Sequence, residues 1–272
     1  MNNPPRVFLL GAGPGDPELL TLKAARILRA ADVVLHDSLI DPRILDLTSP
    51  QTKLIDVGKR CGRHLVSQSE ISRLICEQAL AGHSVVRLKG GDPMIFGRAT
   101  EEIAAMNAQG ISFEVVPGVT AAAAAAASLG ASLTRRGVAR SLHVLSGHGA
   151  EGWGAAGGLP AHDWVSLAKA GGTLAIYMGG HTVAGLTAHL IEAGMSPSIP
   201  AAAVENASLP DERVMRSTLA SLPRAVTDAA GAGPVLLLIG EALGDLGTVQ
   251  NLGVSPDGGP EGWGAPAACA SD

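Results

Sequence analysis

Four short turns carry an aspartate or threonine, three of them together with glycine, and each follows an apolar run of the sequence. The turns are Gly13-Pro-Gly-Asp16, His36-Asp37, Gly90-Gly-Asp92 and Pro117-Gly-Val-Thr120. A carboxylate can accept a proton, and glycine lets the backbone approach a small ligand closely. The carboxyl ends of parallel strands lie along one edge of a sheet, where α/β proteins bind their ligands. We therefore expect the four turns to form one cleft that binds a small cofactor.

An acid and a base can face this cleft, because Asp37 and Lys59 follow consecutive apolar runs. Basic residues also cluster near the glycine-rich turns. One cluster is Lys59, Arg60 and Arg63, and the other is Arg135, Arg136 and Arg140. Such a cluster can be merely a solvated face. The formal charge of -5 argues against a nucleic-acid partner. On a chain that is acidic overall, two such clusters favour an anionic substrate.

Several common chemistries are excluded by their missing motifs. The turn at 11–16 has Asp16 where a dinucleotide-binding GxGxxG motif needs its third glycine. The sequence has no P-loop, no GxSxG elbow, no HExxH and no CxxC. The three cysteines are therefore expected to be free thiols, and no metal site is predicted.

The elements that must hold these turns alternate between short apolar runs and helical periodicity. With 46% hydrophobic but only 3% aromatic residues, the core must be built from Ala, Val, Leu and Ile, which suits strands covered by helices. Strands are predicted over 7–10, 33–36, 53–57, 84–88 and 112–116, with helices over 17–31, 69–81 and 100–109. This pattern is typical of βαβ units.

A second α/β unit is predicted after Pro117-Gly118. Thr120 is a suitable N-cap for a helix over 121–127 that Gly130 ends. Further strands are expected over 142–146, 173–178, 201–205 and 235–239, with a helix over 182–193. The sequence thus predicts two α/β domains with mostly parallel sheets, at 1–117 and 118–244, and a disordered Gly/Pro-rich tail at 245–272.

Seven segments, in consistent order, resemble the tetrapyrrole methylases. They are 7–23 (VFLLGAGPGDPELLTLK), 33–40 (VVLHDSLI), 57–68 (VGKRCGRHLVSQ), 86–102 (VRLKGGDPMIFGRATEE), 115–122 (VVPGVTAA), 134–137 (TRRG) and 203–206 (AVEN). Segment 86–102, one of the two longest, is very specific. The resemblance implies the fold of class III methyltransferases, in which the cofactor cleft lies between two α/β domains.

The resemblance also implies the reaction. S-adenosylmethionine would be the methyl donor and S-adenosylhomocysteine its product, and the chain looks most like members that methylate uroporphyrinogen III. Successive methylation at C2 and C7 would give precorrin-1 and then precorrin-2 for siroheme or cobalamin biosynthesis. A stand-alone, cytoplasmic transferase that acts as a homodimer, without a membrane or nucleic-acid partner, is expected.

The roles of individual residues follow from the matched motifs. The proton acceptor falls on Asp37 and the proton donor on Lys59. The cofactor contacts fall on Pro14, Gly90, Gly91, Asp92, Ile95, Thr120, Ala121, Met178 and Ala207. The basic residues expected to bind the substrate carboxylates are Arg60, Arg63, Arg98, Arg135 and Arg136.

Some of these residues could instead have a structural or simpler binding role. Met178 could be a core residue, and Lys59 could anchor the substrate without transferring a proton. The sequence also departs from the family, which usually has Gly-Thr where Ala207-Ser208 stands, so a positive φ at Ala207 would be strained. Two other functions stay open: methylation of a later corrin precursor, and binding of the cofactor without catalysis.

Overall fold

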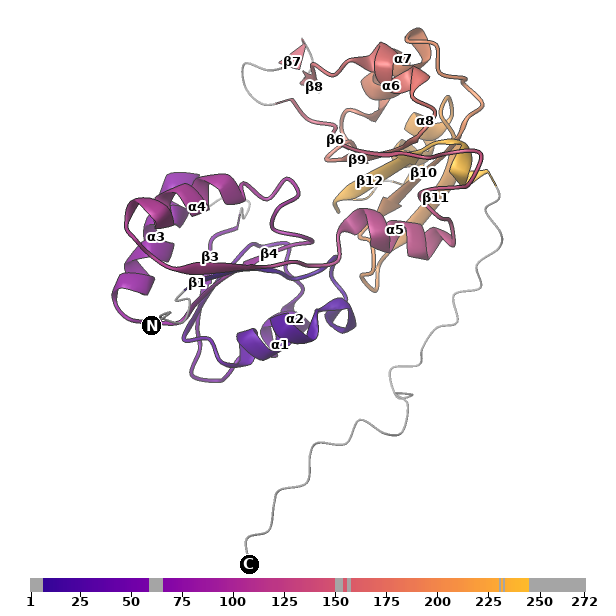
Figure 1. The fold of residues 1–272 in the computed structure, drawn as a ribbon. Helices are drawn as coiled ribbons and strands as arrows, with labels where there is room; N and C mark the ends of the chain where they lie inside the picture. Colours follow the sequence, from indigo (N-terminus) through magenta and orange to yellow (C-terminus); the bar gives the residue numbers. More distant parts are fainter. Residues whose placement is uncertain are drawn as a thin grey trace, which may run out of the picture.

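The chain folds into two α/β domains, each built on a five-stranded sheet (Figure 1). The structure is a computed structural model, and it describes residues 7–58, 66–149, 154–155, 158–229, 231 and 233–244. The tail expected to be disordered, 245–272, lies outside the described residues. No helix in the described ranges is long and apolar enough to span a membrane.

The first sheet is entirely parallel, as predicted. Its strands have the order β3-β2-β4-β1-β5, and each pairs in parallel with its neighbours. The strands are β1 (Val7–Gly11), β2 (Val33–His36), β3 (Lys53–Asp56), β4 (Val85–Lys89) and β5 (Phe113–Val116). The helices are the 3-10 turn η1 (Pro17–Leu19), α1 (Leu22–Arg29), α2 (Pro42–Leu45), α3 (Gln68–Leu80) and α4 (Ala99–Ala108).

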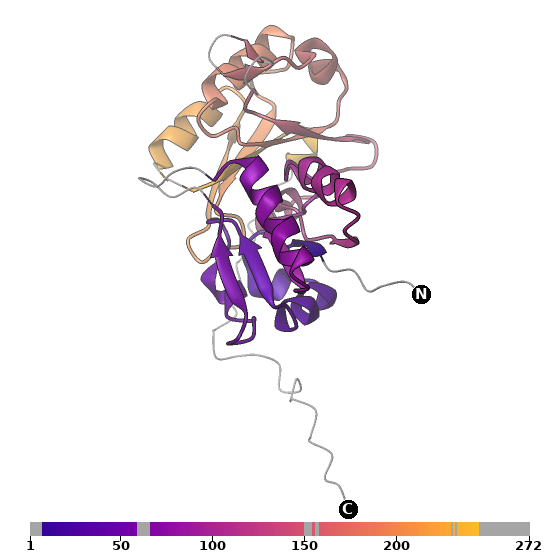
Figure 2. The ribbon, with the colours of Figure 1, turned by 90° about the vertical axis from the view of Figure 1, so that its left-hand side faces the viewer.

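Helices cover both faces of this sheet because alternate residues of each buried strand point to opposite sides. Leu9, Leu35 and Val85 pack with apolar residues of α3 and α4. Leu10 and Val86 pack on the other face with residues of α1 and α2. The helices α3 and α4 lie side by side over the sheet (Figure 2). A side chain on strand positions 85, 87 or 89 therefore faces α3 and α4.

The second sheet has the order β11-β10-β12-β9-β6. Its strands are β6 (Leu142–Ser146), β9 (Thr173–Tyr177), β10 (Pro200–Glu205), β11 (Arg213–Thr218) and β12 (Val235–Ile239). The helices α5 (Ala121–Leu129), α6 (Trp164–Lys169), α7 (Val183–Glu192) and α8 (Leu222–Ala229), the short pair β7 (Gly154–Ala155) and β8 (Leu159–Pro160), and the turn η2 (Glu241–Leu243) complete the domain.

The expectation of mostly parallel strands is wrong for this second sheet. Only β6 and β9 are parallel, whereas the pairs β9 with β12, β10 with β12 and β10 with β11 are antiparallel. The cause is the strand β11, which the sequence analysis did not predict. Because β11 follows β10 directly and folds back beside it, the chain reaches β12 running in the opposite direction to β10. The prediction of two α/β domains is nevertheless confirmed.

The helix α5 belongs to the core of the second sheet. It begins after Thr120 and ends at Gly130, whose φ of 63° is the left-handed conformation expected of a glycine that closes a helix. Its alanines pack against β10 and β12, on the face opposite to α6, α7 and α8. The domain boundary predicted at residues 117 and 118 stays a prediction, and this packing supports it.

Candidate active site

Asp37 lies at the carboxyl edge of the first sheet, directly after β2. Its Oδ1 accepts a hydrogen bond of 2.5 Å from Nη2 of Arg87, on the neighbouring strand β4. Asp37 follows Leu35 by two positions and Arg87 follows Val85 by two, so both side chains lie on the face that α3 and α4 cover. The Asp37 side chain is 32% exposed and that of Arg87 only 3%. A buried guanidinium thus orients a carboxylate that ligands can reach.

Glu102 of α4 holds Arg87 from behind. Its side chain is 0% exposed, and Oε1 accepts from Nε of Arg87 at 3.1 Å. Nζ of Lys89 donates to both oxygens of Glu102, at 2.9 and 3.1 Å, and Nε2 of Gln68 donates to Oε1 at 3.1 Å. Asp37, Arg87, Glu102 and Lys89 therefore form a network of two acids and two bases, which we call the buried charge network.

Burial is the main influence on the pKa of Lys89. Loss of hydration lowers the pKa of this amine, the nearby charge of Arg87 lowers it further, and the carboxylates of Glu102 and Asp37 act in the opposite direction. Two cations so close together need the Glu102 carboxylate between them, because an uncompensated buried charge is strongly unfavourable.

The loops after β1, β4 and β5 meet beside this network. Gly13 and Gly91 exchange backbone hydrogen bonds of 3.2 and 2.7 Å. Gly118 allows the third loop to approach, since a Cβ atom on it would lie 2.2 Å from the carbonyl oxygen of Gly91. A Cβ on Gly90 would meet nothing within 4 Å. The backbone at Gly90 is therefore open to a ligand, whereas Gly118 is needed for packing of the loops.

Asp92 ties two of these loops together. Its Oδ1 accepts from the backbone N–H of Met94 at 2.8 Å and its Oδ2 from that of Gly118 at 3.1 Å. From the sequence we expected Asp92 to contact the cofactor. That role stays a prediction, and the carboxylate also has the structural role of joining the β4 and β5 loops.

The second domain contributes residues that follow β9 and β10. Met178 is 52% exposed with φ of 57°, so the interpretation of Met178 as a core residue is wrong. Ala207 is buried, and it is not among the residues with positive φ. Its neighbours Asn206 and Ser208 have positive φ instead, of 52° and 67°. The Ser208 hydroxyl accepts from the backbone N–H of Asp16 at 3.1 Å, which connects the two domains.

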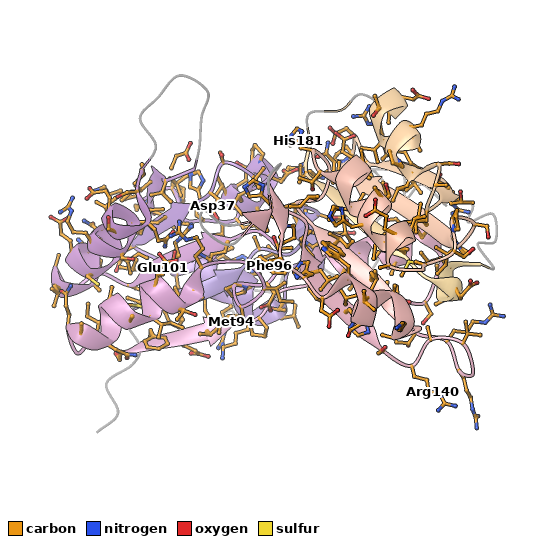
Figure 3. All side chains as sticks on the ribbon, turned by 90° about the horizontal axis from the view of Figure 1, so that it is seen from above. Asp37, Met94, Phe96, Glu101, Arg140 and His181 are labelled. Carbon is orange, nitrogen blue, oxygen red and sulfur yellow. The ribbon has the colours of Figure 1, made fainter. Side chains whose placement is uncertain are left out.

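The predicted substrate-binding arginines that the structure describes lie farther apart than the residues around Asp37. Arg98 is exposed and forms a bidentate pair with Glu101, at 2.7 and 2.8 Å. Arg135 and Arg136 lie on an exposed turn. Asp37 and Phe96 lie where the two domains meet, whereas Arg140, near that turn, lies at the opposite end of the second domain (Figure 3). The predicted catalytic residue Lys59 and its neighbours Arg60 and Arg63 lie outside the described residues.

Other cofactor predictions fall on loops around the same edge. Pro14 lies in the β1 loop and Ile95 in the β4 loop, and both are partly buried. Thr120 and Ala121 stand where α5 begins, also partly buried. The structure thus brings predicted contacts from the β1, β4 and β5 loops together, and their contact with a cofactor stays a prediction.

Lys89 and Glu102 were not predicted as site residues from the sequence, and no individual role was predicted for Arg87. A signal was present, because a parallel strand buried on both faces should be apolar throughout. Arg87 and Lys89 interrupt such a strand at alternate positions, which places two cations on one buried face. A buried acid from a covering helix was then required to balance them.

The arrangement suits proton transfer next to a bound small molecule. The Asp37 carboxylate is accessible and oriented, so it can act as a general base towards a ligand bound at this edge of the sheet. Open backbone at Gly90 and the positioned loops provide hydrogen-bonding groups without bulky side chains. Among the described residues no cluster of His, Cys, Asp or Glu suited to a metal ion is found.

Comparison with known proteins places this chain in a family. Residues 6–223 match the model of the Tetrapyrrole (Corrin/Porphyrin) Methylases. The chain is 46% identical over 235 residues to a uroporphyrinogen-III C-methyltransferase of Paracoccus denitrificans, covering 86% of this chain and 80% of that protein. It is 44% identical over 237 residues to a siroheme synthase of Gluconacetobacter diazotrophicus, covering 87% of this chain and 49% of that protein.

A solved structure agrees with these sequence relatives. The uroporphyrin-III C-methyltransferase of Thermus thermophilus, complexed with S-adenyl homocysteine, superposes with a TM-score of 0.71 at 40% identity. The match covers 88% of this chain and 93% of the Thermus chain. The chain belongs to the tetrapyrrole methylase family. It spans about half the length of the siroheme synthases that it matches, and 80% of the Paracoccus methyltransferase.

Proposed function

We propose that this protein is an S-adenosylmethionine-dependent C-methyltransferase that converts uroporphyrinogen III to precorrin-2 through precorrin-1. The observation that carries the proposal is the Asp37 carboxylate, held by Arg87 beside the glycine loops at the edge of the parallel sheet. The names of the relatives from Paracoccus and Thermus support the substrate, and the ligand of the Thermus structure supports the cofactor. The product would enter siroheme or cobalamin biosynthesis.

The loops fit this cofactor in their shape. Gly90 and Gly91 offer backbone groups where a side chain would meet no protein atom closer than 4.0 Å, so space for a ligand exists there. Pro14, Ile95, Thr120, Ala121, Met178 and Ala207 would line the rest of that space. When bound, the sulfonium of S-adenosylmethionine supplies a methyl group to a carbon nucleophile by in-line displacement, which requires alignment above all.

The protein's own part would be to hold the substrate and move protons. The carboxylate of Asp37 would accept the proton that a pyrrole ring of the tetrapyrrole loses once it is methylated, while Arg87 keeps Oδ1 in place. Lys59 would be the proton donor. Arg60, Arg63, Arg98, Arg135 and Arg136 would bind carboxylates of the substrate, for which the paired N–H groups of arginine are suited.

The decisive test is anaerobic incubation of the protein with uroporphyrinogen III and methyl-labelled S-adenosylmethionine. Two labelled methyl groups per product are expected. One would restrict the product to precorrin-1, and none would refute the proposal. Turnover of a later corrin precursor in place of uroporphyrinogen III would move the function to a different member of the family.

The role of Asp37 is tested separately with Asp37→Asn, which keeps the shape of the side chain but loses its basicity. We expect methyl transfer to fall by about 10²–10⁴-fold, with unchanged affinity for S-adenosylhomocysteine. Asp228→Asn is the control, because Asp228 is an exposed acid that pairs with Arg224 on α8. Normal turnover by Asp37→Asn would remove Asp37 from the mechanism.

We also propose that the protein is a cytoplasmic homodimer that needs neither a membrane nor a nucleic acid. The resemblance to the family supports the dimer, and the formal charge of -5 speaks against nucleic-acid binding. Light scattering after size-exclusion chromatography should give twice the chain mass of 27.4 kDa. A single-chain mass would refute the dimer.

A further inference from the structure

Tyr177, the only tyrosine of the chain, ends β9 at the edge that faces the first domain. Its hydroxyl oxygen lies 2.5 Å from Oγ1 of Thr120 and accepts a hydrogen bond of 3.0 Å from the backbone N–H of Ala122. The first N–H groups of a helix have no partner within the helix and need one from outside. Thr120 stands at the N-cap of α5 but makes no capping hydrogen bond itself. Tyr177 therefore supplies the cap from another element.

The ring of Tyr177 also contacts the first domain. It lies 5.3 Å from the ring of Phe96, centroid to centroid, at a tilt of 53°, which is a favourable geometry for two aromatic rings. Phe96 has φ of 52°, and the residue is 45% exposed. A positive φ at a bulky residue is strained and persists only where its surroundings hold it. The Tyr177 ring is one of the groups that hold it.

Three segments that carry predicted cofactor contacts thus meet at one side chain. Phe96 follows Ile95, Ala122 follows Thr120 and Ala121, and Met178 follows Tyr177 itself. These segments come from three different loops and from both domains. No residue assignment that follows from the family resemblance includes Tyr177.

We propose that Tyr177 is a positioning residue for cofactor binding, which holds the β4 loop, the start of α5 and Met178 in their mutual arrangement. This inference rests on the proposed function, because it assumes that these loops bind S-adenosylmethionine. The hydroxyl acts on the start of α5, and the ring acts on the β4 loop. Without the hydroxyl, Thr120 and the first turn of α5 lose a fixed position before the cofactor binds, and ordering them then costs affinity.

The test is Tyr177→Phe, which keeps the ring against Phe96 and removes only the hydroxyl. One lost hydrogen bond of 0.5–1.5 kcal/mol corresponds to about 2–10-fold. We expect the Kd for S-adenosylhomocysteine, measured by calorimetry, and the KM for S-adenosylmethionine to rise by that factor. We expect kcat at saturating cofactor to stay within about twofold of the original enzyme, because the hydroxyl touches no reacting atom.

Thr187→Val is the matched control. Thr187 is a buried residue of α7 in the same domain, and its hydroxyl donates to the carbonyl of Ala184 at 3.0 Å. Removing that hydroxyl should lower the Tm without changing the Kd. Phe96→Leu provides a second variant that is expected to fold, because the side chain is half exposed. It should weaken S-adenosylhomocysteine binding through loss of the ring contact.

The outcomes separate this inference from the proposed function. If the unchanged protein does not bind S-adenosylhomocysteine, the proposed function fails. If the unchanged protein binds it and Tyr177→Phe binds equally well while only its Tm falls, Tyr177 is merely structural and the inference is overturned. Should Tyr177→Phe not fold, an unchanged Kd in Phe96→Leu overturns the inference, and a raised Kd supports it.

Discussion

The two sheets differ in how their buried charges are balanced. The central strand β4 of the first sheet carries Arg87 and Lys89, both buried and balanced by the fully buried Glu102. In the second sheet, the described strands hold Glu205 as their buried acid, and its partner Arg213 is 41% exposed. Burying several charges together is costly and rarely stabilises a protein. In the first domain the network orients Asp37 through Arg87, whereas the second domain has an ion pair between Glu205 and Arg213 of its edge strand.

Glutamine substitutions of the two buried glutamates should sharpen this contrast most. Glu102→Gln leaves Arg87 and Lys89 buried with only Asp37 to balance them, and should lower the free energy of unfolding by about 3–5 kcal/mol. Glu205→Gln loses one partner of the partly exposed Arg213 and should cost about 1–3 kcal/mol. Urea unfolding measures both. Equal losses would contradict the idea that the two domains differ.

Glycine substitutions at the loop edge of the first domain should have the next largest effect. In Gly118→Ala the new Cβ would lie 2.2 Å from the Gly91 carbonyl, so loops on both sides must shift, at a cost of about 1–3 kcal/mol. Gly90→Ala meets no protein atom within 4 Å and should leave stability within about 0.5 kcal/mol.

Gly90→Ala should affect ligand binding much more than it affects stability. Gly90→Ala should weaken S-adenosylhomocysteine binding by about tenfold or more, because the methyl group occupies the space proposed for the ligand. Calorimetry on the folded variant measures this. Unchanged affinity in Gly90→Ala would show that the ligand does not approach the backbone there.

Lys89 should make the free energy of unfolding depend on pH in the alkaline range. Its pKa in the folded protein lies below its usual value of 10.5, chiefly because of burial. The cost of protonated Lys89 is fully present below the folded pKa and is relieved as the pH rises from there towards 10.5. The Lys89→Met variant lacks this relief. Urea unfolding from neutral to alkaline pH should therefore show the unchanged protein gaining stability relative to Lys89→Met, and parallel curves would contradict the assignment.

Much of the first domain could be predicted from the sequence because each βαβ unit shows its own periodicity. The strands at 7–10, 33–36 and 112–116 and the helix at 69–81 are confirmed to within a residue or two. The helix predicted over 17–31 is instead the turn η1 followed by α1. Thr21 caps α1 by accepting from the N–H of Ala24, which restarts the helix inside the apolar stripe.

The second sheet was less predictable because its directions depend on an edge strand. β11 reads RVMRST and is only partly buried, so it lacks the apolar pattern of a core strand. Likewise, Asp37 could be predicted from its position after a strand, but its contact with Arg87 could not. That contact depends on the register that pairs Leu35 with Arg87 across β2 and β4, which the local sequence does not contain.

The smallest effect is expected from a buried hydroxyl of the second sheet. Thr173 begins β9 and is fully buried, and its Oγ1 is the one buried side-chain polar atom in the described residues that has no hydrogen-bond partner. A buried polar group without a partner is unfavourable, so Thr173→Val, which keeps the shape, should leave the free energy of unfolding unchanged or raise it by up to about 1 kcal/mol. Thr187→Val removes a hydroxyl that does have a partner and should lower it by about 1 kcal/mol. Urea unfolding of the pair measures the difference. A larger loss in Thr173→Val than in Thr187→Val would mean that the second sheet depends on a polar contact at the start of β9.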